Sequence, residues 1–392
     1  MSPLDDLLDA RPTEAAWRRA CPLLADLDAA ALAAVAPRVL AWPAQLRPMP
    51  DDWWAQWTAG DRRPHHDLAG TRMLGTLDHV ELGRVAEGPG GEDEAEGAYF
   101  YHGATGVAAP SGLSWLALGA AAEWHHNGGD VVRWSTLSHA SLIWYLEGDE
   151  YHDEAVDLQL SPDGGTLVTA VEGRWHAWSA ATGDELWVDS GSPDQGLVRF
   201  AFSADGRRVA AGTESGTVAV IETASGRRLL TVPASGPVAL DATGDLLAHT
   251  TPEGDAVVRD TGGGAVVTTV PTSLTQVNAL ALAPDGGALL AVGEGTQMID
   301  LRTGTPGEPA HPADLPLKLD ATCRYAVRAT RALWTDTGPL AYIVTDGGSA
   351  LLNAEGRALW AHPTGVIGAF TPDGRALVTV GDTIEAWFVR AL

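Results

Sequence analysis

The chain has 392 residues, of which 45% are hydrophobic, a content typical of a globular protein with a packed core. This composition excludes an intrinsically disordered chain and a fibrous one. With 51 acidic against 25 basic residues the net charge is -26 at pH 7, so nucleic acids and anionic membranes are repelled at long range. We therefore expect no nucleic-acid or membrane partner, and a protein partner that is neutral or basic at the contact.

Residues 1–86 are predicted to form a mostly helical N-terminal segment. Apolar side chains recur there at helical spacing: Leu4, Leu7, Leu8, Trp53 and Trp57. Because a segment of this size buries too little surface to be stable alone, we expect its helices to pack on the rest of the chain. The N-terminus lacks the basic residues of a signal peptide, and no run approaches the roughly 18 apolar residues of a membrane span. These features favour a cytoplasmic protein.

Residues 87–97 are predicted to be a flexible linker. Positions 87–96 contain five acids, three glycines and a proline, with no basic residue. An acidic, glycine-rich segment offers little apolar surface to bury and is therefore expected to stay flexible. The linker leads into a larger domain that we place at residues 98–392.

The larger domain is built from a repeated pattern in which an apolar run, a short Asp-Gly turn and a second apolar run follow one another. The turn lies at 161–164, 203–206, 283–286 and 371–374, with weaker copies at 241–244 and 320–323. Its copies are 37 to 51 residues apart, close to the roughly 40–45 residues of a four-stranded propeller blade. The sequence thus predicts a mainly β fold, a seven-bladed β-propeller of four-stranded antiparallel blades preceded by a small α-helical segment.

The last repeat predicts how the ring of blades closes. Residues 366–392 supply only three strands, so a fourth must come from elsewhere to cover the exposed edge. The aromatic segment 98–102 is the predicted closing strand, because it directly precedes the first blade. Residues 80–85 are the alternative.

Residues 113–392 resemble the WD40-repeat β-propellers and the related quinoprotein-like repeats. Three tryptophans fall where the family places the tryptophan of its Trp-Asp pair, although Ser or Phe follows each: Trp134, Trp178 and Trp387. The segments 181–187 and 354–360 are similar to the quinoprotein-like version. No unit begins with the Gly-His pair of regular members. The resemblance implies a propeller that binds its ligands on the face formed by loops between blades and between second and third strands.

The first blade and the acidic segment after it supply the predicted binding surface. Aromatic residues and histidines are dense in the first blade, and residues 147–157 carry six acids and no base. Blade core and a solvated acidic loop are the alternative interpretations; the functional one is an acidic lip that attracts a basic partner. The predicted binding residues are Trp124, His125, His126, Tyr145, Glu147, Asp149, Glu150, Tyr151, His152, Asp153 and Glu154.

The sequence contains no recognisable catalytic motif, and we predict no cofactor and no metal. His65, His66 and Asp67 lack a further ligand at a suitable spacing, and Cys21 and Cys323 are too far apart to suggest a disulfide framework or a metal site. We therefore predict a non-enzymatic scaffold or adaptor that binds a protein or basic peptide on one propeller face. The alternative is a propeller enzyme, a hydrolase, lyase or cyclase. Its site would need acids and histidines to converge at the central channel, from among His102, His125, His152 and Asp153.

Overall fold

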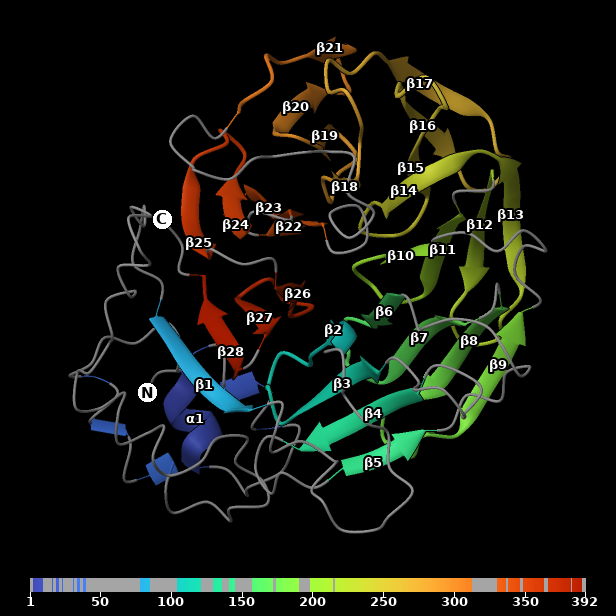
Figure 1. Cartoon of the computed structure of the whole chain (residues 1–392). Coiled ribbons are helices and arrows are strands. Elements are labelled where there is room, and N and C mark those ends of the chain that lie inside the picture. The colour runs from blue at the N-terminus through green and yellow to red at the C-terminus, as the bar shows by residue number, and fades with distance from the viewer. Residues whose placement is uncertain are drawn as a thin grey trace.

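The strands of this chain form four-stranded antiparallel sheets that are arranged as a ring, the β-propeller arrangement (Figure 1). The computed structural model describes residues 3–9, single positions and pairs between 16 and 39, and residues 78–84, 104–120, 130–135, 141–144, 157–171, 174–189, 198–213, 216–311, 330–335, 338–345, 348–362, 366–381 and 383–389. In each sheet one edge strand lies innermost and contacts the innermost strands of the two neighbouring sheets.

Six of the sheets are blades of four consecutive strands. The first three comprise β2 (Ala104–Ala108), β3 (Trp115–Ala120), β4 (Asp130–Ser135), β5 (Ser141–Trp144), β6 (Asp157–Leu160), β7 (Thr166–Val171), β8 (Arg174–Ser179), β9 (Glu185–Asp189), β10 (Val198–Phe202), β11 (Arg208–Thr213), β12 (Thr217–Glu222) and β13 (Arg228–Pro233). The next three comprise β14 (Ser235–Leu240), β15 (Leu246–Thr250), β16 (Ala256–Asp260), β17 (Val266–Val270), β18 (Ala279–Leu282), β19 (Ala288–Val292), β20 (Thr296–Asp300), β21 (Thr305–Pro306), β22 (Arg331–Thr335), β23 (Gly338–Thr345), β24 (Gly348–Asn353) and β25 (Ala358–His362).

The expectation of seven blades is corrected by the remaining sheet. Six blades, not seven, are built from four consecutive strands, whereas this sheet combines both ends of the described chain in the order β1-β28-β27-β26. Its strands are β26 (Ile367–Phe370), β27 (Ala376–Val380), β28 (Thr383–Phe388) and β1 (Asp78–Arg84). Figure 1 shows β1 lying along β28.

The strand that covers β28 is also not the predicted one. β1 pairs with β28 from Asp78 opposite Phe388 to Arg84 opposite Thr383, with a bulge between Glu81 and Gly83. This is the alternative segment, and residues 98–102 lie outside the described residues. The prediction failed because it rested on the position of 98–102 directly before the first blade, and closeness in sequence does not decide which strand reaches a given edge.

The repeated turns occupy the predicted place, between the innermost strand of a blade and the next strand. At 161–164 the backbone N–H of Gly164 donates to the carbonyl of Ser161 at 2.8 Å, and Gly164 adopts a φ of 70° that favours glycine. Asp163 Oδ1 accepts hydrogen bonds from Ser161 Oγ at 2.6 Å and from the N–H of Gly165 at 2.9 Å. The Asp-Gly pair recurs because it satisfies the backbone groups of this turn.

In one blade, the turn between the two innermost strands lies at a position that the repeated sequence pattern does not mark. In the blade of β22 to β25, the first turn connects Thr335 with Gly338, whose carbonyl accepts a hydrogen bond from Thr335 Oγ1 at 2.6 Å. The predicted copy at 320–323 lies outside the described residues. The turn was missed because its glycine follows Asp-Thr rather than the Pro-Asp of the clear copies.

Tryptophans of two sheets have the same environment. Trp178 Nε1 donates to Thr169 Oγ1 at 3.1 Å, and Trp387 Nε1 donates to Thr379 Oγ1 at 2.9 Å. In both cases the tryptophan lies on the third strand of its sequence repeat and the threonine on the second. The two tryptophans are therefore structurally equivalent, as the sequence alignment of the repeats predicts.

Side chains connect the blade of β6 to β9 with the blade of β10 to β13. Trp187 of β9 donates from Nε1 to the carbonyl of Thr223 at 2.7 Å. Arg228 of β13 donates from Nε to Asp189 at 2.7 Å, and its guanidinium carbon lies 5.1 Å from the ring centre of Trp175. Because these contacts are partly or fully buried, they hold neighbouring sheets in a fixed orientation.

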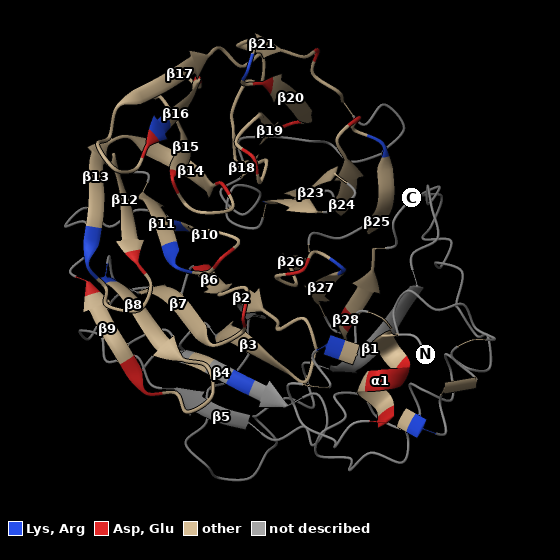
Figure 2. Ribbon diagram, turned by 180° about the vertical axis from the view of Figure 1, so that it is seen from behind, with Lys and Arg blue, Asp and Glu red and all other residues tan. Residues whose placement is uncertain are grey.

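The N-terminal helix α1 (Pro3–Asp9) packs on the propeller, as predicted for the helical segment. Its leucines, Leu4, Leu7 and Leu8, are buried in one cluster with Leu116 of β3 and Val378 of β27. Arg38 reaches the opposite side of the helix, where it pairs with Asp5 at 2.6 Å and with Asp9 at 2.7 Å. The helix therefore covers the junction between the composite sheet and the blade that follows β1 in the chain (Figure 2).

Candidate functional site

A cavity of about 200 Å³ lies at the centre of the ring, lined by residues of the innermost strands β6, β10, β14, β18 and β22. Residues of the repeated turns also line it: Pro162, Ala204, Ala242, Pro284 and Pro372. Since these turn residues are half-buried or exposed, the cavity opens on the face that bears the repeated turns. Figure 2 shows acidic positions in the turns around this opening, accompanied by basic positions near β10 and near β26.

The inner end of the cavity is polar. Five polar residues there lie within one residue of the start of an innermost strand, and each is at least nine-tenths buried: Asp157, Arg199, Asn278, Thr330 and Arg331. Burying a polar or charged group costs free energy unless it forms hydrogen bonds or ion pairs. The interactions of these side chains therefore determine which ligands this part of the cavity can bind.

An ion pair crosses the centre of the ring. Arg331 Nη2 donates to Asp157 Oδ1 at 2.7 Å, and the N–H of Phe200 donates to Asp157 Oδ2 at 3.1 Å. β6 packs beside β2 and β10, whereas β22 packs beside β18 and β26. Asp157 and Arg331 therefore connect sheets that are not neighbours, and they do so with side chains that are 1% and 10% exposed.

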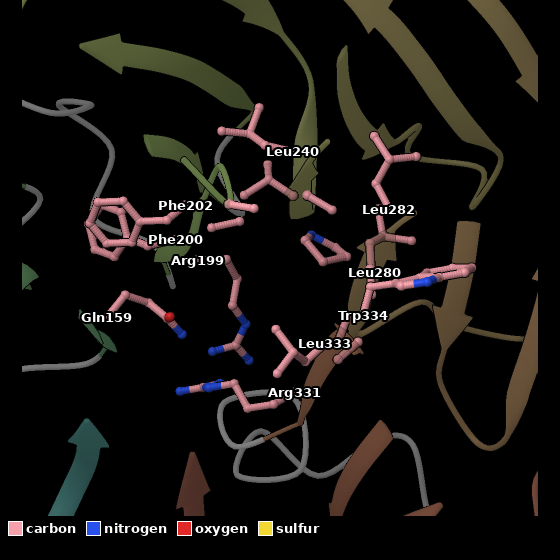
Figure 3. Close-up of a pocket in the computed structure, with 18 of the residues that line it drawn as sticks. Gln159, Arg199, Phe200, Phe202, Leu240, Leu280, Leu282, Arg331, Leu333 and Trp334 are labelled. Carbon is pink, nitrogen blue, oxygen red and sulfur yellow. The ribbon is translucent and has the colours of Figure 1, made fainter. Parts of the chain in front are cut away.

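Arg199 lies beside this pair. Figure 3 shows its guanidinium pointing towards that of Arg331, with the amide of Gln159 close to both. Arg199 and Arg331 both take part in further interactions that hold them in place. Among the described residues, Nε and Nη2 of Arg199, Nε of Arg331 and Oδ1 of Asn278 make no hydrogen bond. The inner end thus presents N–H donors of two arginines and one amide oxygen to the cavity.

The outer end of the cavity is apolar. Side chains just before the repeated turns form this part: Leu160, Phe202, Leu240, Leu282, Leu333 and Trp334. Phe202, Leu333 and Trp334 are only partly buried. A molecule that enters from the turn face therefore meets apolar side chains first and the arginines last (Figure 3).

The predicted binding residues all lie outside the described residues. This holds for Trp124, His125, His126, Tyr145, Glu147, Asp149, Glu150, Tyr151, His152, Asp153 and Glu154, and equally for His102, which the enzyme alternative requires. The predicted surface stays a prediction. In the described part of the chain, no three His, Cys, Asp or Glu side chains are grouped to bind a metal ion.

The arginines of the cavity were missed by sequence analysis. The sequence does contain a signal, because Arg199 is the second residue of β10, in VRFAF, and Arg331 is the first residue of β22, in RALWT, two innermost strands that are otherwise mostly apolar. A charged residue inside such a strand is unusual, since the strand is buried on both sides. Sequence analysis instead placed the binding surface in the aromatic first blade and the acidic segment after it.

Comparisons with known proteins inform the fold only. No family model and no curated protein matches the sequence. Among solved structures, a chain from the "Crystal Structure of Mitotic Checkpoint Complex" is similar, with a TM-score of 0.57 and 16% sequence identity over 81% of this chain and 93% of that chain. This similarity supports the propeller architecture and does not assign the chain to a family. No helix in the described ranges is long and apolar enough to cross a membrane.

Proposed function

We propose that this chain is a non-enzymatic protein-interaction module, a scaffold or adaptor of WD40-like type that binds a partner on one propeller face. The observation that carries the proposal is the fold, which it shares with a chain of a protein complex at a TM-score of 0.57. A propeller holds many loops on a rigid frame, so a partner can bind without ordering the surface first.

Rigidity is supported by contacts between turns of different blades. The N–H of Asp205 donates to the carbonyl of Ala242 at 3.1 Å, and the N–H of Ala242 donates to the carbonyl of Pro284 at 3.2 Å. Arg208 Nη1 also donates to the carbonyl of Gly244 at 2.7 Å and to Thr261 Oγ1 at 2.8 Å. Such links between blades keep the positions of loops on the ring fixed relative to one another.

The net charge of the chain indicates the chemistry of the proposed partner. A net charge of -26 attracts a basic partner at long range and speeds its encounter. The proposed contact is the acidic segment with Glu150, Asp153 and Glu154, together with the aromatic residues near Trp124. Electrostatic attraction by exposed acids weakens with salt, because the Debye length falls from about 30 Å at 0.01 M to about 3 Å at 1 M.

A charge-reversal experiment tests this proposal. A partner is first captured from a lysate of the source organism, and its affinity is then measured at low and high salt for the wild type and for E150K/D153K/E154K. The reversal is expected to weaken binding at least tenfold at low salt and to flatten its salt dependence. The matched control E253K/E308K/E355K changes the charge equally at exposed positions outside the strands and is expected to weaken binding less. Equal effects of both triple variants would rule out the assigned surface.

A further inference from the structure

We propose that the central cavity is a binding site for a small apolar carboxylate, which Arg199 and Arg331 bind at the inner end. The carboxylate can belong to a free carboxylic acid or to the C-terminus of a peptide chain. The inference does not depend on the proposed function, because a free acid would occupy the same cavity without any protein partner.

The two guanidinium groups carry the argument for a carboxylate. Arg199 is 8% exposed and Arg331 is 9% exposed, and their guanidinium groups point towards each other inside the cavity (Figure 3). Nε and Nη2 of Arg199 are adjacent donors on one edge of the planar group, which matches the two oxygens of a carboxylate. Asp157 fixes Arg331 from the other side, so the donors are oriented before a ligand arrives.

The amide of Asn278 indicates a second feature of the ligand. Asn278 is 4% exposed, lines the cavity, and its Oδ1 makes no hydrogen bond in the described part of the chain. Buried polar atoms of this kind are normally satisfied by a donor. A ligand with an N–H near its carboxylate, such as the last residue of a peptide, would provide that donor.

The volume of the cavity and the residues at its outer end further restrict the class of ligand that can bind. The cavity of about 200 Å³ is smaller than the roughly 300–1,000 Å³ of sites for drug-sized ligands and cofactors. A nucleotide is therefore too large, whereas one amino-acid residue or a short carboxylic acid is of suitable size. Because Phe202, Leu240 and Leu282 line the outer end, the group attached to the carboxylate is expected to be apolar.

The test uses three small probes on the full chain. Binding of N-acetyl-leucine, N-acetyl-leucinamide and 4-methylpentanoate is measured by calorimetry at pH 7. We expect the two acids to bind and the amide to bind at least about tenfold more weakly, since it lacks the charge that the arginines recognise. Tighter binding of N-acetyl-leucine than of 4-methylpentanoate identifies a peptide C-terminus as the favoured source, and equal binding identifies a free acid as sufficient.

Variants assign the effect to the cavity. R199Q is expected to weaken binding of the acids at least about tenfold, while R302Q is the matched control because Arg302 is an exposed arginine on a turn. If R199Q does not fold, R199K is used, which keeps the charge but loses the planar pair of donors. Equal binding of acid and amide, no binding of either acid at millimolar concentration, or acid binding unchanged in the Arg199 variant would overturn the proposal.

The result is separable from the test of the proposed function. Carboxylate binding at buried arginines is expected to depend weakly on salt, whereas binding of a basic partner by exposed acids depends strongly on it. Two results together would therefore support both proposals independently. The first is that R199Q loses carboxylate binding, and the second is that E150K/D153K/E154K still weakens partner binding to the same extent.

Discussion

A buried histidine couples stability of the propeller to pH. His249 of β15 is 2% exposed; its Nε2 accepts a hydrogen bond from Arg259 Nε at 2.9 Å, and its Nδ1 donates to the carbonyl of Thr250 at 3.0 Å. Only a neutral ring makes both bonds. Burial lowers the pKa of His249 below its usual 6.5, the bond to Thr250 opposes that shift, and Arg259 adds to it.

This environment predicts a loss of stability in acid. As pH falls below 6.5, the unfolded chain takes up a proton at His249 before the folded chain does, so the free energy of unfolding decreases. The contribution is fully present above that pH. Urea unfolding at pH 7.5 and pH 5.5 is expected to show a larger loss for the wild type than for H249Q, whose amide is also neutral. An equal loss in both proteins would show that His249 does not titrate differently in the folded state.

At the level of single residues, sequence analysis was correct where a side chain forms hydrogen bonds with backbone groups a few residues away. Asp163 and Gly164 were predicted correctly because the Asp-Gly turn is a local structure whose hydrogen bonds lie within a few residues. Asp157 and Arg331 meet across 174 residues of sequence. Their pairing depends on closure of the whole ring, and no local pattern encodes which charged residues will then face each other.

At the level of elements, closure by β1 predicts that residues 78–84 are essential for the stability of the composite sheet. His79 pairs with Trp387, and the next residue, Val80, pairs with Ala386. Because N–H groups alternate in direction along a strand, the N–H of one of these two residues faces β28 and that of the other faces away. Proline at the inward position removes a ladder hydrogen bond and is expected to cost about 1–3 kcal/mol.

The measurement compares H79P and V80P by urea unfolding, with F100P as the control in the segment that sequence analysis favoured. One of the first two variants is expected to be clearly less stable than the other, and F100P less affected than that variant. A large loss in F100P with none in H79P and V80P would contradict closure by β1. Sequence analysis recognised that an edge strand was missing. The choice between two nearby segments depends on the path of the chain, which closeness in sequence to the first blade does not reveal.

For the whole molecule, the excess of acids predicts that salt stabilises the fold at neutral pH. Folding brings 51 acidic residues against 25 basic ones into a compact volume, and the resulting repulsion favours the expanded chain. Exposed ion pairs such as Arg38–Asp5 oppose this, but each contributes only about 0–1 kcal/mol. Repulsion between unpaired acids is the larger effect. Salt should therefore stabilise the fold more by screening this repulsion than it destabilises the fold by screening the ion pairs.

The melting temperature is therefore expected to rise between 10 mM and 500 mM NaCl at pH 7, where the Debye length falls from about 30 Å to less than 10 Å. The sequence pI of about 4.6 supplies a control within the same protein. At pH 5 the net charge is small, so the rise with salt should shrink. A melting temperature that falls with salt at pH 7 would mean that ion pairs between and within blades outweigh the net repulsion. In that case the exposed acids would be largely neutralised locally, and long-range attraction of a basic partner would be correspondingly weak.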